Sequence, residues 1–109
     1  MDATTLSALL ARRLRTGPGA LAFTEGDRDW TVADFDRAVG QAAIWLEGQG
    51  IGPGDRVALW LVNRIEWLVL YFALARRGAT AVAVNTRYRV AELQHVLGLS
   101  RASLLITQK

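Results

Sequence analysis

The stretch that decides the fold is Gly50-Ile-Gly-Pro-Gly-Asp-Arg-Val-Ala-Leu-Trp-Leu-Val-Asn63. From residue 56 to 62 it shows little alternation of polar and apolar side chains, which is typical of a strand buried on both faces of a parallel sheet. The three glycines and Pro53 follow a predicted helix and open this strand, so we interpret them as a connector. A phosphate-binding glycine loop has the opposite order, because it follows a strand and opens a helix whose N–H groups meet the phosphate.

A parallel α/β order continues after this strand. Asn63, with Glu66 three residues later, predicts a capping box for a helix over 64–77, and Gly78 is placed to end that helix. The helix is apolar almost all round, so we expect it to be buried on more than one side. A strand is predicted at 81–84, followed by a helix and by a second strand over 103–107. The predicted fold is therefore α/β, with two overlapping βαβ units and right-handed crossovers. The apolar residues that predict the later helix are Val90, Leu93, Val96 and Leu97.

The residues before the connector predict a helix, a hairpin and a second helix. Leucines recur at helical spacing from Leu6 to Leu14, and Gly17-Pro-Gly19 ends that helix. Strands over 21–24 and 29–31 flank a turn that contains Gly26. Thr31, with an acid three residues later at Asp34, predicts a capping box for a helix that begins at residue 32 and ends near 48–50. The residues expected on the buried face of this helix are Phe35, Ala38, Val39, Ala42 and Leu46.

Composition excludes several classes of protein. The 109 residues fit one domain, and 51% hydrophobic residues are ample for a core. With no cysteine, no disulfide framework or thiolate metal site is expected, and one histidine does not favour an imidazole-based metal site. The longest apolar run, 67–75, is about half of the ~20 residues that span a bilayer, so we predict a soluble, cytoplasmic chain with no transmembrane segment. The net charge of +3 comes from scattered arginines, which does not indicate nucleic-acid binding.

Two small groups of polar residues suggest chemistry but have simpler explanations. Glu25, Asp27 and Asp29 surround the hairpin turn, where a metal cage would need further oxygen ligands that are not evident, so we predict a solvated turn. His95 lies on the helix that begins near Val90. No nucleophile or orienting acid accompanies it, so we interpret it as a partly exposed packing residue and not as a base.

The carboxyl ends of the predicted strands are the expected place for a ligand, because open α/β sheets bind ligands there. The turns at this edge carry Asn63 and the segment 85–89, Asn-Thr-Arg-Tyr-Arg. We expect Asn63 to cap a helix and Asn85 to stabilise its turn. Arg87 and Arg89 are expected to pair with acids elsewhere in a longer enzyme. Direct contact of these side chains with a ligand is the alternative that the sequence leaves open.

Six short motifs, in this order and spacing, resemble the N-terminal region of the adenylate-forming (AMP-binding) superfamily. The similarity runs from about Leu6 to Thr107 and is strongest to the acyl-CoA synthetases and fatty-acid CoA ligases. The motifs are Thr31-Val-Ala-Asp-Phe35, Gly54-Asp-Arg-Val57, Asn63-Arg-Ile-Glu66, Gly78-Ala79, Val84-Asn-Thr-Arg-Tyr-Arg89 and Ala91-Glu-Leu93.

The resemblance implies ATP-dependent ligation of a carboxylic acid to coenzyme A, with Mg²⁺ and an acyl-adenylate intermediate. In the family, the phosphate loop, the ribose-binding aspartate, the Mg²⁺ ligand and the catalytic lysine lie beyond the region that residues 1–109 resemble. Nothing here matches them, and Lys109, the sole lysine, lacks the surroundings of the catalytic one. We therefore assign no catalytic, cofactor-binding or metal residue, and we expect this chain alone to bind no cofactor. The identity of the acid cannot be read from the sequence.

Our leading interpretation is that residues 1–109 are the N-terminal part of an acyl-CoA synthetase domain, inactive alone and truncated before the phosphate loop. It would then need the missing C-terminal portion. The alternative is a non-catalytic interaction module that docks on another adenylating subunit. An independent nucleotide-binding protein is disfavoured, because neither strand-to-helix turn has the glycines or hydroxyl donors that phosphate requires. Because two βαβ units leave sheet edges unpaired, we also expect self-association.

Overall fold

The computed structural model describes residues 3–61 and 65–107. A helix, an antiparallel hairpin and a second helix are followed by three parallel strands that alternate with two helices, as the sequence predicts. The elements are α1 (Ala3–Thr16), β1 (Leu21–Glu25), β2 (Arg28–Thr31), α2 (Val32–Gly48), β3 (Arg56–Trp60), α3 (Ile65–Arg76), β4 (Thr80–Ala83), α4 (Val90–Ser100) and β5 (Leu104–Thr107).

The parallel sheet has the strand order β4-β3-β5, so β3 is its central strand. Val57 pairs with Ala81 of β4 on one side and with Leu104 of β5 on the other. The α/β prediction is confirmed, and the two βαβ units share β4. The strand order also shows that the connection from β4 through α4 crosses over β3, so β4 and β5 pair with opposite edges of β3.

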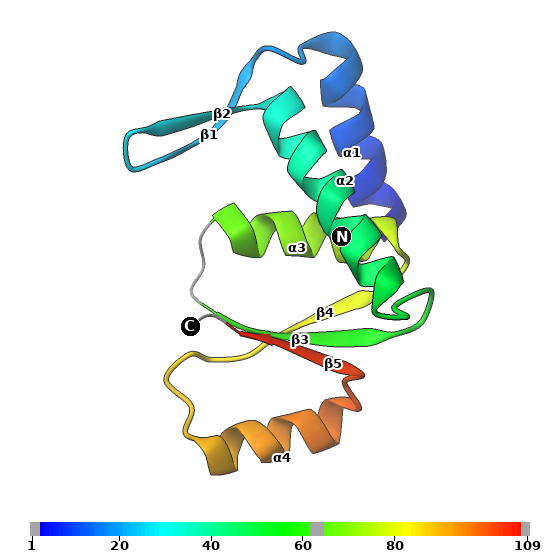
Figure 1. The fold of residues 1–109 in the computed structure, drawn as a ribbon, viewed down its shortest axis with the longest axis vertical. Coiled ribbons are helices and arrows are strands. Elements are labelled where there is room, and N and C mark those ends of the chain that lie inside the picture. The colour runs from blue at the N-terminus through cyan, green and yellow to red at the C-terminus, as the bar shows by residue number, and fades with distance from the viewer. Residues whose placement is uncertain (1–2, 62–64, 108–109) are drawn as a thin grey trace.

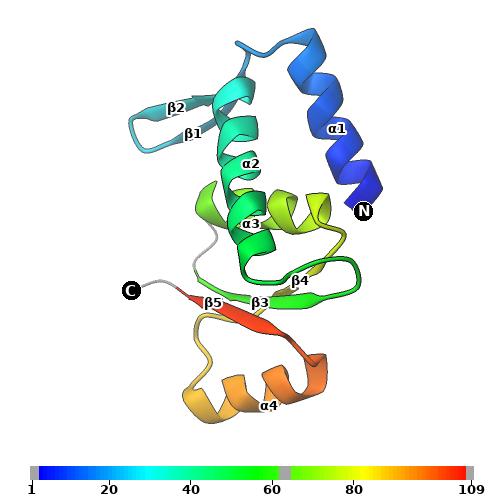
Figure 2. The ribbon, with the colours of Figure 1, turned by 45° about the vertical axis from the view of Figure 1, so that its right-hand side comes forward.

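Helices cover the two faces of this sheet unequally. In Figures 1 and 2, α3 lies on one face with α1 and α2 stacked beyond it, while α4 alone lies on the opposite face. Val57 and Leu59 belong to the larger core with Phe35 and Leu74, whereas Ala58 packs with Leu93 of α4. Successive strand residues point to opposite faces, so the buried positions of β3, residues 57–59, are apolar on both faces.

Helix α3 is packed on more than one side, as its composition predicts. It contacts α1, α2 and β4, and Ala73 and Leu74 are fully buried. An aromatic series connects it to the hairpin: the ring of Phe23 lies 5.0 Å from that of Phe35, which meets Phe72 edge-on at 5.2 Å. The two α-helical layers and the hairpin therefore share one core.

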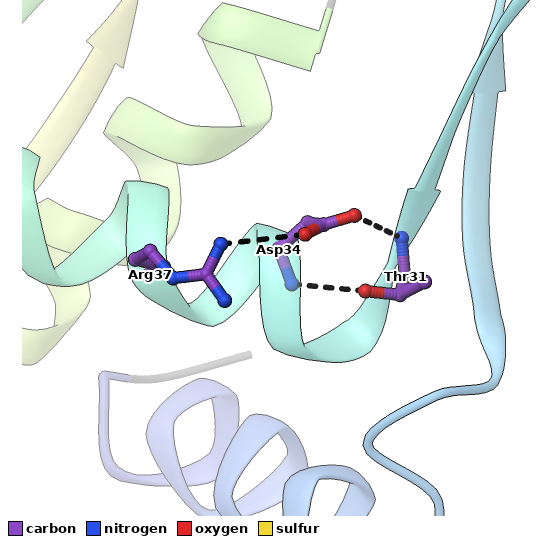
Figure 3. A network of polar contacts seen from close by, with 3 residues as sticks. All are labelled: Thr31, Asp34 and Arg37. Carbon is purple, nitrogen blue, oxygen red and sulfur yellow. Dashed lines mark hydrogen bonds and ion pairs between the residues drawn. The ribbon is translucent and has the colours of Figure 1, made fainter.

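The capping box at the start of α2 is confirmed (Figure 3). The backbone N–H of Asp34 donates to Thr31 Oγ1, and the N–H of Thr31 donates to Asp34 Oδ2, each over 3.1 Å. Arg37 lies 3.4 Å from the other carboxylate oxygen, Oδ1. The hydrogen bond from the Thr31 backbone is the largest influence that lowers the pKa of Asp34 below its ordinary value of 3.8, followed by the one with the Thr31 side chain.

The glycine-rich connector is a packed corner between α2 and β3. Gly50 and Gly54 have φ of 79° and 83°, values that suit glycine. The N–H of Gly54 donates to the carbonyl of Gly78, whose own φ is 71°. A Cβ on Gly78 would lie 3.4 Å from Pro53 Cα, which is an ordinary contact, so the positive φ is what favours glycine at this position.

The remaining differences from the sequence predictions are small. The hairpin strands extend to Glu25 and Arg28, and β3 ends at Trp60 although the prediction ran to residue 62. Helix α3 ends one residue earlier than predicted, β4 lies one residue earlier at both ends, and β5 begins one residue later. The cap predicted at Asn63 lies outside the described residues. Among the helices that the structure describes, none combines the length and apolarity of a membrane span.

We predict that replacing Asp34 with alanine destabilises the chain at neutral pH and progressively less in acid. A carboxylate whose folded pKa is depressed stabilises the fold above its ordinary pKa of 3.8, and this contribution is lost as the pH falls through the lower folded value. Urea unfolding at several pH values measures the difference in the free energy of unfolding between Asp34→Ala and the parent chain. Asp27→Asn in the exposed hairpin turn is the control, and a gap independent of pH would contradict the prediction.

We predict that Gly78→Ala lowers the free energy of unfolding by about 1 kcal/mol or more, because alanine is strained at positive φ. Gly98→Ala is the matched control, since that helical glycine has open space around it and alanine should stabilise the helix by roughly 0.5–1 kcal/mol. Unfolding by denaturant measures the free energy of unfolding of both variants. Equal effects of the two substitutions would show that residue 78 does not require a positive φ.

Candidate functional site at the carboxyl edge of the sheet

The carboxyl ends of the three parallel strands meet at one edge of the sheet. A shallow hollow of about 240 Å³ lies there, lined by Trp60, Leu61, Thr86 and Thr107. Trp60 ends β3, Thr86 follows β4 and Thr107 ends β5, so each strand contributes one or more of the lining residues. This is the position at which open α/β sheets bind ligands.

The loop after β4 is held by Asn85. Its side-chain oxygen accepts a hydrogen bond from the backbone N–H of Arg87 over 2.9 Å, and its carbonyl accepts one from the indole N–H of Trp60 over 3.1 Å. The prediction that Asn85 stabilises this turn is confirmed. The indole contact was not predicted, because residues 60 and 85 are far apart in the sequence. A tryptophan in a strand does not indicate which group accepts its indole N–H.

Arg87 and Arg89 are exposed beside this edge. Arg89 occupies the residue before α4, where it makes no side-chain capping hydrogen bond. Within residues 3–61 and 65–107, neither guanidinium forms an ion pair. Their expected pairing with acids elsewhere in a longer enzyme therefore stays a prediction, as does direct contact with a ligand.

The amides of the glycine connector and of Ile65 are not free to bind the phosphates of a nucleotide. At the connector, Gly52 N–H donates to the carboxylate of Asp55 over 2.8 Å, and Gly54 N–H is bonded to a backbone carbonyl. At the start of α3, Ile65 N–H donates to the carboxylate of Glu25 over 2.9 Å. These amides already have acceptors from the protein itself, so neither turn offers them to a phosphate.

The described residues also provide no metal cage. Two of the three acids around the hairpin turn are engaged separately: Glu25 accepts the backbone N–H of Ile65, and Asp29 accepts from the Thr24 hydroxyl over 2.9 Å. No cluster of three or more candidate ligands occurs among the residues that the structure places. His95 is exposed on α4, in an open hollow that it shares with Tyr88 and Glu92. Lys109 lies outside the described residues.

Comparison with known proteins identifies the source of this architecture. The model of the family described as "AMP-binding enzyme" matches residues 10–109. A feruloyl-CoA synthase from Amycolatopsis sp. is 41% identical over 95 residues, which are 87% of this chain and 19% of that protein. The chain thus spans about a fifth of the length of this curated relative.

Two solved structures share the fold closely. A fatty acyl CoA synthetase from Mycobacterium tuberculosis superposes with a TM-score of 0.89 at 32% identity, over 94% of this chain and 21% of that one. The o-succinylbenzoate CoA synthetase of Bacillus subtilis, in complex with AMP, gives a TM-score of 0.87 at 28% identity, over 92% of this chain and 26% of that one. The chain therefore belongs to the AMP-binding enzyme family, and it matches the N-terminal part of the acyl-CoA synthetases.

Proposed function

We propose that this chain supplies the N-terminal part of an ATP-dependent acyl-CoA synthetase. In the overall reaction, a carboxylate oxygen attacks the α-phosphorus of ATP and releases pyrophosphate, and the thiol of coenzyme A then attacks the acyl carbon and releases AMP. The observation that carries the proposal is the 0.89 superposition on a fatty acyl CoA synthetase over 94% of the chain. Its relatives include enzymes named for an aromatic acid and for fatty acids, so we leave the acid open.

The role of this part is architectural. The glycine connector and the start of α3 engage their amides internally, and Asn85 fixes the loop after β4 at the edge where a ligand is expected. The chain would thus contribute a wall of the ligand-binding region and would leave adenylation and Mg²⁺ binding to other parts of the enzyme. We accordingly propose that the chain is inactive alone. We also propose a cytoplasmic location, which the cysteine-free composition supports.

The parallel sheet supports a further expectation about partners. Both β4 and β5 pair only with β3, so each presents an unpaired edge within the described sheet. Large apolar side chains are also exposed, among them Ile44 at 72% and Leu99 at 71%. Edges and apolar surface of this kind promote association between chains unless another segment covers them. We propose that the remaining portion of an adenylating enzyme provides this cover.

We predict that the purified chain catalyses no acid-dependent exchange between ATP and pyrophosphate, but functions within a chimaera. In the chimaera, this chain replaces the aligned N-terminal segment of the Amycolatopsis feruloyl-CoA synthase, to which it is 41% identical. We expect feruloyl-CoA formation by the chimaera and none by the recipient without the segment. Thioester formation, followed by chromatography, is the measurement.

A Leu59→Asp chimaera is the control, because it places a charge at a position of β3 that is fully buried. A folded, monodisperse chimaera without activity would contradict the proposed function, as would exchange by the purified chain. Stable binding of the chain to an adenylating subunit without gain of activity would instead favour the non-catalytic interaction module.

We predict that the isolated chain self-associates and binds hydrophobic dyes, and that both properties disappear in the chimaera. Light scattering coupled to size exclusion measures the first, and dye fluorescence the second. The physical reason is the unpaired edges of β4 and β5. A monomeric chain that binds no dye and unfolds cooperatively would show that this small sheet needs no cover.

A further inference from the structure

One hydrogen bond connects the hairpin to the start of α3. Glu25, the last residue of β1, accepts the backbone N–H of Ile65 on its Oε2 over 2.9 Å, and this contact is partly buried. Ile65 is the first described residue of α3, 40 residues further along the chain. The sequence gives no sign of this pairing, since Glu25 reads as part of a solvated turn.

The contact has a clear electrostatic rationale. The first N–H groups of a helix have no acceptor within the helix, and the helix dipole favours a negative charge at that end. A carboxylate that accepts such an N–H forms a charge-assisted hydrogen bond, which is stronger than a neutral one. Glu25 thus stabilises α3 from another element of the fold.

A second contact holds the hairpin in the same place. Alternate residues of a strand lie on the same face, so Phe23 and Glu25 both face the helices. Phe23 packs on Phe35, which in turn packs edge-on against Phe72 of α3. The apolar contact fixes the distance of the hairpin from α3, and the carboxylate fixes its position along the helix.

We infer that Glu25 is a positioning residue that holds the hairpin to the start of α3 and keeps the Ile65 amide closed to ligand anions. Ile65 follows one of the two strand-to-helix connections of the sheet, and an anion that binds its amide would have to displace the carboxylate of Glu25. Any phosphate bound at this edge would therefore contact other groups. The inference does not rest on the proposed function, because it concerns one contact within the 109-residue chain.

Amide hydrogen exchange in the 109-residue chain, followed by NMR, tests the first part. In Glu25→Ala we expect exchange at Ile65 to accelerate roughly tenfold or more relative to the buried Leu59 of β3, as for the loss of one hydrogen bond to a charged group. Glu25→Gln, whose amide oxygen can still accept, should restore part of the protection. Asp27→Asn, an exposed change in the same turn, should leave Ile65 unchanged.

The reference to Leu59 separates a local effect from general loss of stability. If Ile65 in Glu25→Ala exchanges no faster than in the parent chain, or accelerates only as much as Leu59, Glu25 does not hold the start of α3. The second part is tested with inorganic phosphate added to the parent chain. We expect the Ile65 amide resonance to stay in place, and a saturable shift would overturn the claim that this amide is closed.

Discussion

The structure depends on one constraint: β3 is a strand whose two faces and two edges are all covered. Val57, Ala58 and Leu59 are completely buried, which a strand reaches only when helices lie on both faces and neighbours pair with both edges. The chain meets this requirement with α3 on one face, α4 on the other, and β4 and β5 at the edges. The glycine connector then has to deliver the chain into the centre of the sheet, which explains its positive φ angles and its contact with Gly78.

The two faces of the sheet are buried to different extents, and this difference follows from the order of the elements. Everything before β3 packs on the α3 side, where Phe35, Leu46 and Leu74 build a deep core. Among the residues that the structure describes, the buried members of the cluster on the α4 side are Ala58, Val84 and Leu93. Since the apolar area removed from water determines most of the stabilisation, the α4 layer adds less to the stability of the sheet than the α3 side does.

Short-range patterns predicted most of this fold, and long-range contacts marked the limit of prediction. The apolar run of β3 and the Thr31-Asp34 capping box could be predicted from the sequence, because strand burial and capping act over a few residues. The bond from Ile65 to Glu25 and the bond from Trp60 to Asn85 were not, since each joins residues brought together only by the folded chain. The family was recognised from ordered motifs, whereas the strand order β4-β3-β5 needed the structure.

The backbone amides of the connector before β3 and of Ile65 in α3 show how this fold satisfies its own donors. Gly52 donates to Asp55, Gly54 donates to the carbonyl of Gly78, and Ile65 donates to Glu25. Such bonds make the turns rigid, because a buried donor that loses its acceptor costs free energy. The loop fixed by Asn85 presents the exposed side chains of Arg87 and Arg89 beside the carboxyl ends of the strands. Two cations held close together raise the positive potential at this end of the sheet, because their fields add.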